Sequence, residues 1–152
     1  MEEVFNGVDP LVHQSRISVP YSWWAGDTAS RFFVALRDEK KILGTRCAAC
    51  NRTFVPPRKT CPTCFGEDIE WVDVAATGTL ESFTVARRQL AALPKKAPVA
   101  FGLIRLDGAD TGILHYLDEV APEEIRIGMR FEACFAAAPQ GNILDITHFK
   151  PI

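Results

Sequence analysis

Four of the five cysteines form two matching pairs, and they are the residues best suited to chemistry in this chain. Cys47 and Cys50 are separated by two residues, as are Cys61 and Cys64, and ten residues lie between the pairs. Two such turns facing each other can place four thiolates in a tetrahedron, the geometry that Zn²⁺ prefers. A four-thiolate site has no open position for a substrate. The spacing therefore predicts a structural zinc site, with iron or a site that has lost its metal as the alternatives.

The N-terminal residues favour metal binding over disulfide formation. Residues 1–10 include Glu2, Glu3 and Asp9 and lack the basic and apolar regions of a secretory signal. No apolar run reaches the roughly 18 residues that a transmembrane helix needs. We therefore expect a cytoplasmic protein without membrane contact, in which reduced cysteines are metal ligands.

The other reactive side chains do not form a catalytic set in the sequence. Cys134 stands apart from the two pairs, and strand alternation places it on one face with Arg130 and Glu132. It would be a nucleophile only beside a base, and a small apolar residue is the simpler interpretation. The histidines are scattered, at His13, His115 and His148. We predict no catalytic residue in this chain.

Charge is unevenly distributed, although the net charge is only −2. Residues 37–59 carry an excess of bases, whereas residues 67–81 and 107–132 are acidic. A nucleic-acid-binding protein usually carries a basic stripe across its main binding face, so this distribution argues against that class. Four bases flank the loop after the first long strand, where they could bind phosphates or an acidic partner, or simply be solvated: Arg87, Arg88, Lys95 and Lys96.

The N-terminal region is predicted to be an arm followed by a helix. The arm contains Trp23 and Trp24, and we expect this apolar cluster to dock on the barrel or on a second protein, because tryptophan is favoured at interfaces. A helix is expected from Asp27 to about Lys41, capped by Asp27 or Thr28 and followed by Gly44. Its apolar face packs either on its own domain or on a partner.

The remaining residues are rich in strand signals. Five or six strands, with a bend or bulge expected at Gly102 and a final strand over residues 143–150, suit a small closed barrel of the OB type. The spacing also allows a sandwich or an SH3-like barrel. The predicted fold is mainly β: an N-terminal arm and helix (residues 1–41), a rubredoxin-like four-cysteine zinc ribbon (42–68) and an OB-fold barrel (69–152).

Several segments resemble one known family. Residues 32–36, 43–50, 54–58 and 61–64 are similar to the zinc-ribbon/OB-fold proteins associated with acyl-CoA metabolism, and residues 78–85, 127–132 and 149–151 resemble barrel segments of that family. The resemblance runs from Trp23 to Pro151. It departs from the family at Asn51, where glycine is common, but asparagine tolerates the left-handed conformation.

The resemblance implies an accessory subunit. Members of the family work beside thiolase-like proteins, including thiolases, hydroxymethylglutaryl-CoA synthases and retro-aldolases, and some are joined to hydratase domains. It implies that a thiolase-like partner carries the catalytic residues in an α₂β₂ heterotetramer acting on an acyl-CoA thioester. This chain would then scaffold the complex and contribute to the coenzyme A channel. The candidate contacts to coenzyme A or the partner are Arg87, Arg88, Lys95, Lys96, Trp23 and Trp24.

Two other functions compete with this interpretation. A single-stranded nucleic-acid-binding module could stack bases on aromatic side chains above a basic groove. A self-sufficient enzyme would depend on Cys134.

Overall fold

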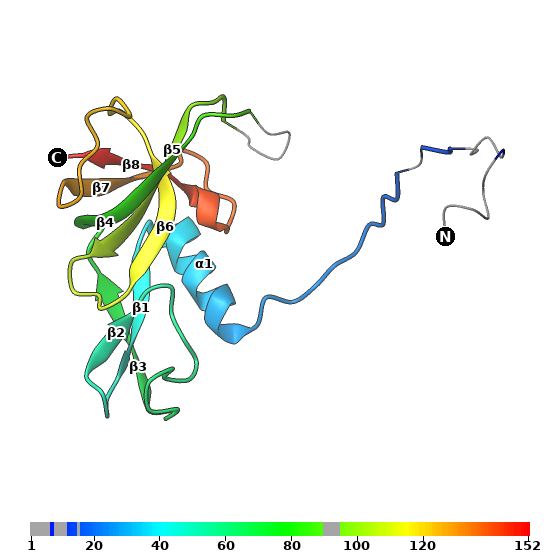
Figure 1. Cartoon of the computed structure of the whole chain (residues 1–152). Helices are drawn as coiled ribbons and strands as arrows, with labels where there is room; N and C mark the ends of the chain where they lie inside the picture. The colour runs from blue at the N-terminus through cyan, green and yellow to red at the C-terminus, as the bar shows by residue number, and fades with distance from the viewer. Residues whose placement is uncertain (1–6, 8–11, 15, 90–94) are drawn as a thin grey trace.

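A small ribbon sheet and a closed barrel make up the body of the protein, with one long helix beside them (Figure 1). The computed structural model describes residues 7, 12–14, 16–89 and 95–152. The ribbon sheet has strand order β2-β1-β3, and the barrel has order β4-β5-β6-β8-β7. This confirms the predicted mainly β fold with a four-cysteine ribbon and a five-stranded OB-like barrel. Among the described helices, none is long and apolar enough to cross a membrane.

The helix α1 (Asp27–Glu39) has nearly the expected bounds but different caps. Its N-cap is Gly26, so the expected capping by Asp27 or Thr28 is wrong. Asp27 lies instead in the first turn, where its charge is favourable to the helix dipole. The helix is followed by its C-cap residue Lys40, which has a left-handed conformation, and Gly44 lies inside the following strand. Phe32 and Leu36 are buried, so the apolar face packs on its own domain.

The ribbon sheet consists of β1 (Ile42–Cys47), β2 (Arg52–Phe54) and β3 (Ile69–Val74). The central strand β1 pairs antiparallel with both neighbours, so that Thr45 lies opposite Phe54 on one side and Trp71 on the other. We expected residues 69–74 to begin the barrel, but β3 pairs with β1 instead. The chain returns from the second cysteine turn along the free edge of β1, where β3 completes the backbone hydrogen bonds.

The barrel is built from β4 (Thr77–Ala86), β5 (Val99–Leu106), β6 (Gly112–Leu117), β7 (Arg130–Phe135) and β8 (Ile146–Pro151). The long strand β4 pairs with both β5 and β7, and its register against β5 shifts between Leu80 and Ser82. The irregularity therefore lies in β4, and the expectation of a bulge at Gly102 is wrong. Gly102 is needed for space, because a Cβ there would lie 2.7 Å from side-chain atoms of Leu80 and Leu117.

The last strand begins later than expected. Residues 143–145 form the short helix η2 (Ile143–Asp145), and β8 follows it. The buried carboxylate of Asp145 accepts hydrogen bonds from the backbone N–H groups of Gln140 and Gly141, both at 2.7 Å. The side chain of Asn142 accepts from Leu144 N–H, completing a capping box. These polar contacts hold the segment in a turn rather than in a strand.

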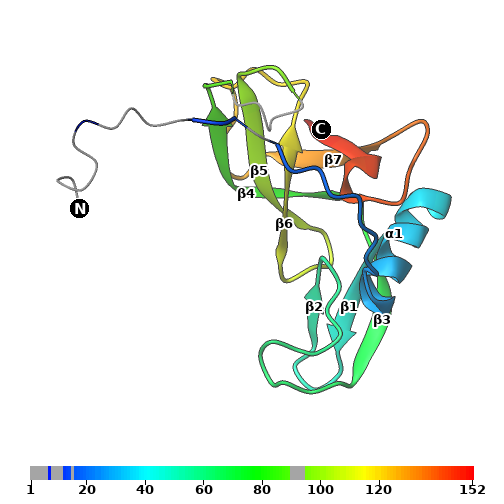
Figure 2. The ribbon, with the colours of Figure 1, turned by 90° about the vertical axis from the view of Figure 1, so that its right-hand side faces the viewer.

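The ribbon, the helix and the barrel share one apolar core. Leu36 of α1, Ile42 of β1 and Val55 cluster with buried barrel residues such as Leu80 and Phe131. The loop between β5 and β6 reaches the ribbon beside β2 (Figure 2). The two modules are therefore one continuous body.

The N-terminal arm leads away from that body (Figure 1). Trp23 and Trp24 are 74% and 75% exposed, and the described residues 12–14 and 16–26 contain no helix or strand. The expected docking of this aromatic cluster on the barrel is not what the structure shows. Docking on a second protein stays a prediction.

Candidate metal centre and partner-facing surfaces

Two backbone turns of the same design present the four cysteines. Cys47 ends β1, and the N–H of Asn51 donates to its carbonyl oxygen at 2.8 Å. In the second turn the N–H of Phe65 donates to the carbonyl oxygen of Cys61 at 2.9 Å. Asn51 and Phe65 have φ of 55° and 59°, so each turn closes on a left-handed residue. Asn51 thus adopts the conformation for which glycine is usual.

The four sulfur atoms have the spacing of a tetrahedral zinc site. The Sγ atoms of the four cysteines all lie within 4.8 Å of one another. The Sγ atoms of Cys47 and Cys64 are 3.6 Å apart, and those of Cys50 and Cys61 are 3.9 Å apart. Zn–S bonds of about 2.3 Å in a tetrahedron require sulfur atoms about 3.8 Å apart. The residues therefore fit a structural zinc ion.

The thiols influence one another's ionisation strongly. The backbone N–H of Cys64 stabilises the Cys61 thiolate and lowers its pKa to about 6. The side chain of Cys64, together with burial, raises the pKa of Cys50 to about 12. Four thiolates this close repel one another, and a divalent cation that replaces their protons removes that repulsion. Binding of zinc would thus be coupled to ionisation and to folding of the ribbon.

The four basic candidates lie at the two ends of the β4–β5 connection. The Nζ atom of Lys95 lies 2.8 Å from Asp118 Oδ2 and 5.0 Å from the ring centroid of Tyr116. Arg87 lies 3.8 Å from Glu123, while Arg88 and Lys96 are exposed. The arm that bears Trp23 and Trp24 enters α1 at the ribbon end of the body, away from this connection (Figures 1 and 2). The role of these six residues in binding coenzyme A or a partner stays a prediction.

His115 is a structural residue. It is only 5% exposed, and both of its ring nitrogens have backbone partners. Nε2 lies 3.1 Å from the carbonyl oxygen of Ile143, and Nδ1 accepts the N–H of Tyr116 at 2.9 Å. This arrangement requires the neutral ring with its proton on Nε2. Burial accordingly lowers the pKa of His115.

Sequence reasoning missed one cluster of reactive side chains. Cys134 and His148 are paired residues of β7 and β8, and His148 Nε2 lies 2.9 Å from Glu119 Oε1. The spacing of the histidines in the sequence pairs none of them with an acid and a nucleophile, but the fold brings His148 to both. The register of β7 against β8 brings Cys134 beside His148, and the turn after β6 brings Glu119 to His148. The sequence carries no direct signal for either pairing. Burial raises the pKa of Cys134, which opposes a role as a free thiolate nucleophile.

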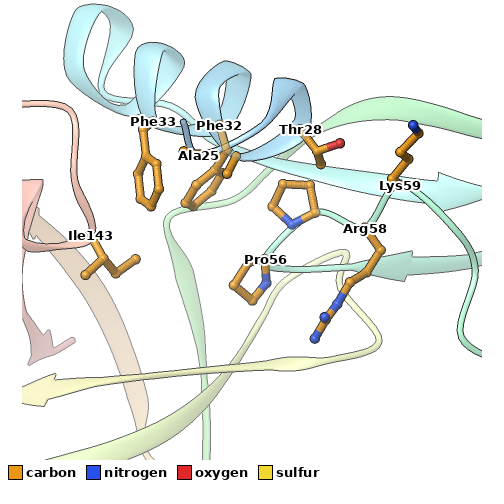
Figure 3. A pocket seen from close by; sticks show the side chains of 10 residues that line it. Ala25, Thr28, Phe32, Phe33, Pro56, Arg58, Lys59 and Ile143 are labelled. Atoms are coloured by element: carbon orange, nitrogen blue, oxygen red, sulfur yellow. The ribbon is translucent and has the colours of Figure 1, made fainter. Parts of the chain in front are cut away.

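A groove of about 440 Å³ lies between α1 and the loop after β2 (Figure 3). Phe32 and Phe33 of α1 line one side, Pro56 lies opposite them, and Ile143 closes one end (Figure 3). Arg58 and Lys59 stand at the other end. The groove therefore combines apolar walls with a positively charged rim.

A second apolar surface covers part of the barrel. Leu114 of β6 is 64% exposed, Leu144 of η2 is 50% exposed and Phe83 of β4 is 36% exposed. The rings of Phe101 and Tyr116 pack against each other beside them, tilted by 37° and with centroids 5.0 Å apart. We call these five residues the apolar barrel face. A contiguous exposed apolar surface is typical of an interaction site.

Two family models match adjoining parts of the chain. The model described as "ChsH2, rubredoxin-like zinc ribbon domain" matches residues 35–70, and "ChsH2, C-terminal OB-fold domain" matches residues 71–136. The chain belongs to this zinc-ribbon/OB-fold family. The family resemblance inferred from the sequence is confirmed.

Individual relatives agree with this assignment. A DUF35 domain-containing scaffold protein of Pyrococcus furiosus is 28% identical over 81% of this chain and 92% of its own length. A probable enoyl-CoA hydratase alpha subunit of Thermomonospora curvata is 32% identical over 64% of this chain but only 30% of its own length. A solved structure titled "Ltp2-ChsH2(DUF35) aldolase" matches with a TM-score of 0.64 and 26% identity, covering 85% of this chain and 98% of the solved chain.

Proposed function

We propose that this chain is a non-catalytic scaffold subunit of a thiolase-type complex that cleaves or forms a carbon–carbon bond beside an acyl-CoA thioester. The observation that carries the proposal is the structural match to a chain of the Ltp2-ChsH2(DUF35) aldolase, which covers nearly all of that chain. The similarity to DUF35 scaffold proteins supports the same role. The proposed assembly is an α₂β₂ heterotetramer.

The chemistry of the chain suits a scaffold. A four-thiolate zinc site has no position at which a substrate could bind. Both ring nitrogens of His115 are occupied by backbone groups, and burial raises the pKa of Cys134, which opposes a role as a free thiolate nucleophile. The catalytic residues of the complex would therefore come from the partner.

The apolar barrel face is our candidate for the partner interface. Its exposed side chains, led by Leu114, resemble the apolar centre of a protein–protein contact. Trp23 and Trp24 offer further anchors on the arm. Burial of these groups against a partner would stabilise the complex through the hydrophobic effect.

We further propose that acyl-CoA is the ligand of the complex. The hydratase subunit that shares part of this chain's sequence supports this ligand class. Arg88 and Lys96 remain candidates for phosphate or partner contacts, together with Arg87 and Lys95. The groove beside α1, with Arg58 and Lys59 at its rim, is a second place where an anionic ligand with an apolar part would fit.

Coexpression with the thiolase-like protein encoded beside this chain tests the assembly. We expect the two proteins to copurify and to have the mass of an α₂β₂ complex by size-exclusion chromatography with light scattering. Leu114→Asp should weaken the complex by at least about tenfold, because it places a charge in an apolar contact. Ile127→Asp is the matched control, since Ile127 is 67% exposed and lies outside the apolar barrel face.

Three results would contradict the proposal. The chain could remain alone when its partner is present, or the isolated chain could turn over a thioester. Steeply salt-dependent binding of single-stranded DNA would instead support the nucleic-acid alternative.

A further inference from the structure

Three potential metal ligands converge at the edge of the barrel, on the side of β7 and β8. Cys134 and His148 lie opposite each other on these antiparallel strands. Glu119 follows β6, and the N–H of the preceding Asp118 donates to the carbonyl oxygen of Phe149 at 3.0 Å, which holds this turn against β8. One ligand atom from each of the three residues lies within 4.8 Å of the others.

The hydrogen bonds around His148 determine which ring nitrogen carries a proton. The hydroxyl of Thr147 donates its only hydrogen to the carbonyl oxygen of Cys134, at 3.0 Å. Its Oγ1 atom must therefore act as an acceptor toward Nδ1 of His148, also at 3.0 Å. Nδ1 then carries a hydrogen, and a neutral ring has its lone pair on Nε2.

That lone pair points at a carboxylate. His148 Nε2 lies 2.9 Å from Glu119 Oε1, and an ionised carboxylate has no hydrogen to donate. The Nε2 lone pair of His148 and the carboxylate of Glu119 are both acceptors and repel each other. A positively charged species between them would remove this repulsion. The species is either a proton, which would make His148 an imidazolium, or a metal cation.

We propose that Glu119, Cys134 and His148 form a second metal site, distinct from the ribbon, for a divalent ion of the zinc class. A thiolate, an imidazole nitrogen and a carboxylate oxygen are all zinc ligands, and three protein ligands leave a fourth position for water or an external donor. A proton would explain only the contact between His148 and Glu119. A metal ion also explains why a cysteine sulfur lies beside both.

The surroundings of the cluster fit a cation. Thr147 supplies the acceptor that a zinc-bound histidine usually has on its other ring nitrogen. Glu132, on the same strand as Cys134, adds negative charge nearby. The Nζ atom of Lys150 lies 3.9 Å from Glu132 Oε2 and neutralises part of that charge. The side chain of His148 is 18% exposed, whereas that of Glu119 is 60% exposed. An ion could therefore reach the site from solvent.

Zinc stoichiometry of the full chain tests this site. The reduced protein is equilibrated with buffered Zn²⁺, freed of unbound metal and analysed by elemental mass spectrometry. We expect about two ions per chain in the wild type and about one in Cys134→Ser and in His148→Ala, because the ribbon keeps its ion. His13→Ala removes an exposed imidazole from the arm and should leave the stoichiometry unchanged.

Substitution of Co²⁺ for Zn²⁺ tests directly whether the Cys134 thiolate binds the metal. Co²⁺ bound to a thiolate absorbs in the near ultraviolet, so the wild type should show more of this absorbance per chain than Cys134→Ser. One ion per chain in the wild type would overturn the proposal and leave an imidazolium–carboxylate ion pair at this place. Two ions per chain in both variants would also overturn it, because the second ion would then lie elsewhere.

Discussion

The two barrel histidines show how the partners of one side chain determine its chemistry. His115 has a backbone acceptor on one ring nitrogen and a backbone donor on the other. Protonation would place a hydrogen on Nδ1 against the N–H of Tyr116, so the folded protein disfavours the charged ring. His148 instead faces a carboxylate with Nε2. One histidine is thus suited to stay neutral, and the other to accept a cation.

His115 should make the protein less stable in mild acid. Its pKa is lowered, mainly by burial, so below pH 6.5 the unfolded chain binds more protons than the folded chain. Stability should fall as the pH drops from 6.5 to the lowered pKa, with a slope of up to about 1.4 kcal/mol per pH unit for one proton. His115→Gln should remove that slope in denaturant unfolding series at several pH values. His13→Gln should retain it, and equal slopes in wild type and His115→Gln would contradict the assignment.

At the scale of elements, close approach of neighbouring atoms explains the glycines at positions 78 and 102 of the barrel. Gly78 lies in β4 where it crosses β5, and a Cβ there would lie 2.5 Å from the carbonyl oxygen of Arg105. At Gly102 the three atoms nearest to a Cβ would be side-chain ends of Leu80 and Leu117. The first collision is with backbone and the second is with atoms that can rotate away.

Alanine at these two positions should therefore destabilise the protein to different extents. We expect Gly102→Ala to lower the free energy of unfolding by about 1–3 kcal/mol, the usual cost of overpacking. Gly78→Ala should cost more, because β4 and β5 must separate. Urea unfolding at fixed zinc concentration measures both. A smaller loss for Gly78→Ala than for Gly102→Ala would contradict this account of the β4–β5 contact.

At the scale of the whole molecule, a few polar contacts fix the ribbon against the barrel. The hydroxyl of Thr111 accepts the N–H of Val55 at 2.8 Å and donates to its carbonyl oxygen at 2.9 Å. Asp110 and Thr53 add a second pair of hydrogen bonds, both at 2.8 Å. Ribbon and barrel residues also share one apolar core, and these directional bonds fix the orientation of the two modules at the junction.

Thr111→Ala should loosen this junction without unfolding either module. It leaves the backbone groups of Val55 without their partner, which should cost about 1–3 kcal/mol. Hydrogen exchange followed by mass spectrometry should show faster exchange in peptides containing Val55, while the barrel strands stay protected. Thr84→Ala changes an exposed threonine of β4 and serves as the control. Unchanged exchange around Val55 would show that the core alone holds the modules together.

Local patterns in the sequence were sufficient for the metal turns, the helix and the mainly β content, but they did not distinguish the barrel from a sandwich. Cys47, Cys50, Cys61 and Cys64 lie at spacings that a single turn dictates, and the bounds of α1 follow a short-range apolar period. Phe131 and Ala133 of β7 are buried, which agrees with the alternation that puts Cys134 on the opposite face with Arg130 and Glu132. Each of these features depends on residues a few positions apart, so the chain encodes them without reference to its other parts.

Only the tertiary structure decided which distant segments meet. The pairing of β3 with β1, the irregularity in β4 and the polar turn around Asp145 each depend on partners that a local pattern does not specify. The meeting of Glu119, Cys134 and His148 has the same origin. A shift of one residue between β7 and β8 would turn these side chains to opposite faces, and register is set by the packing of the whole barrel.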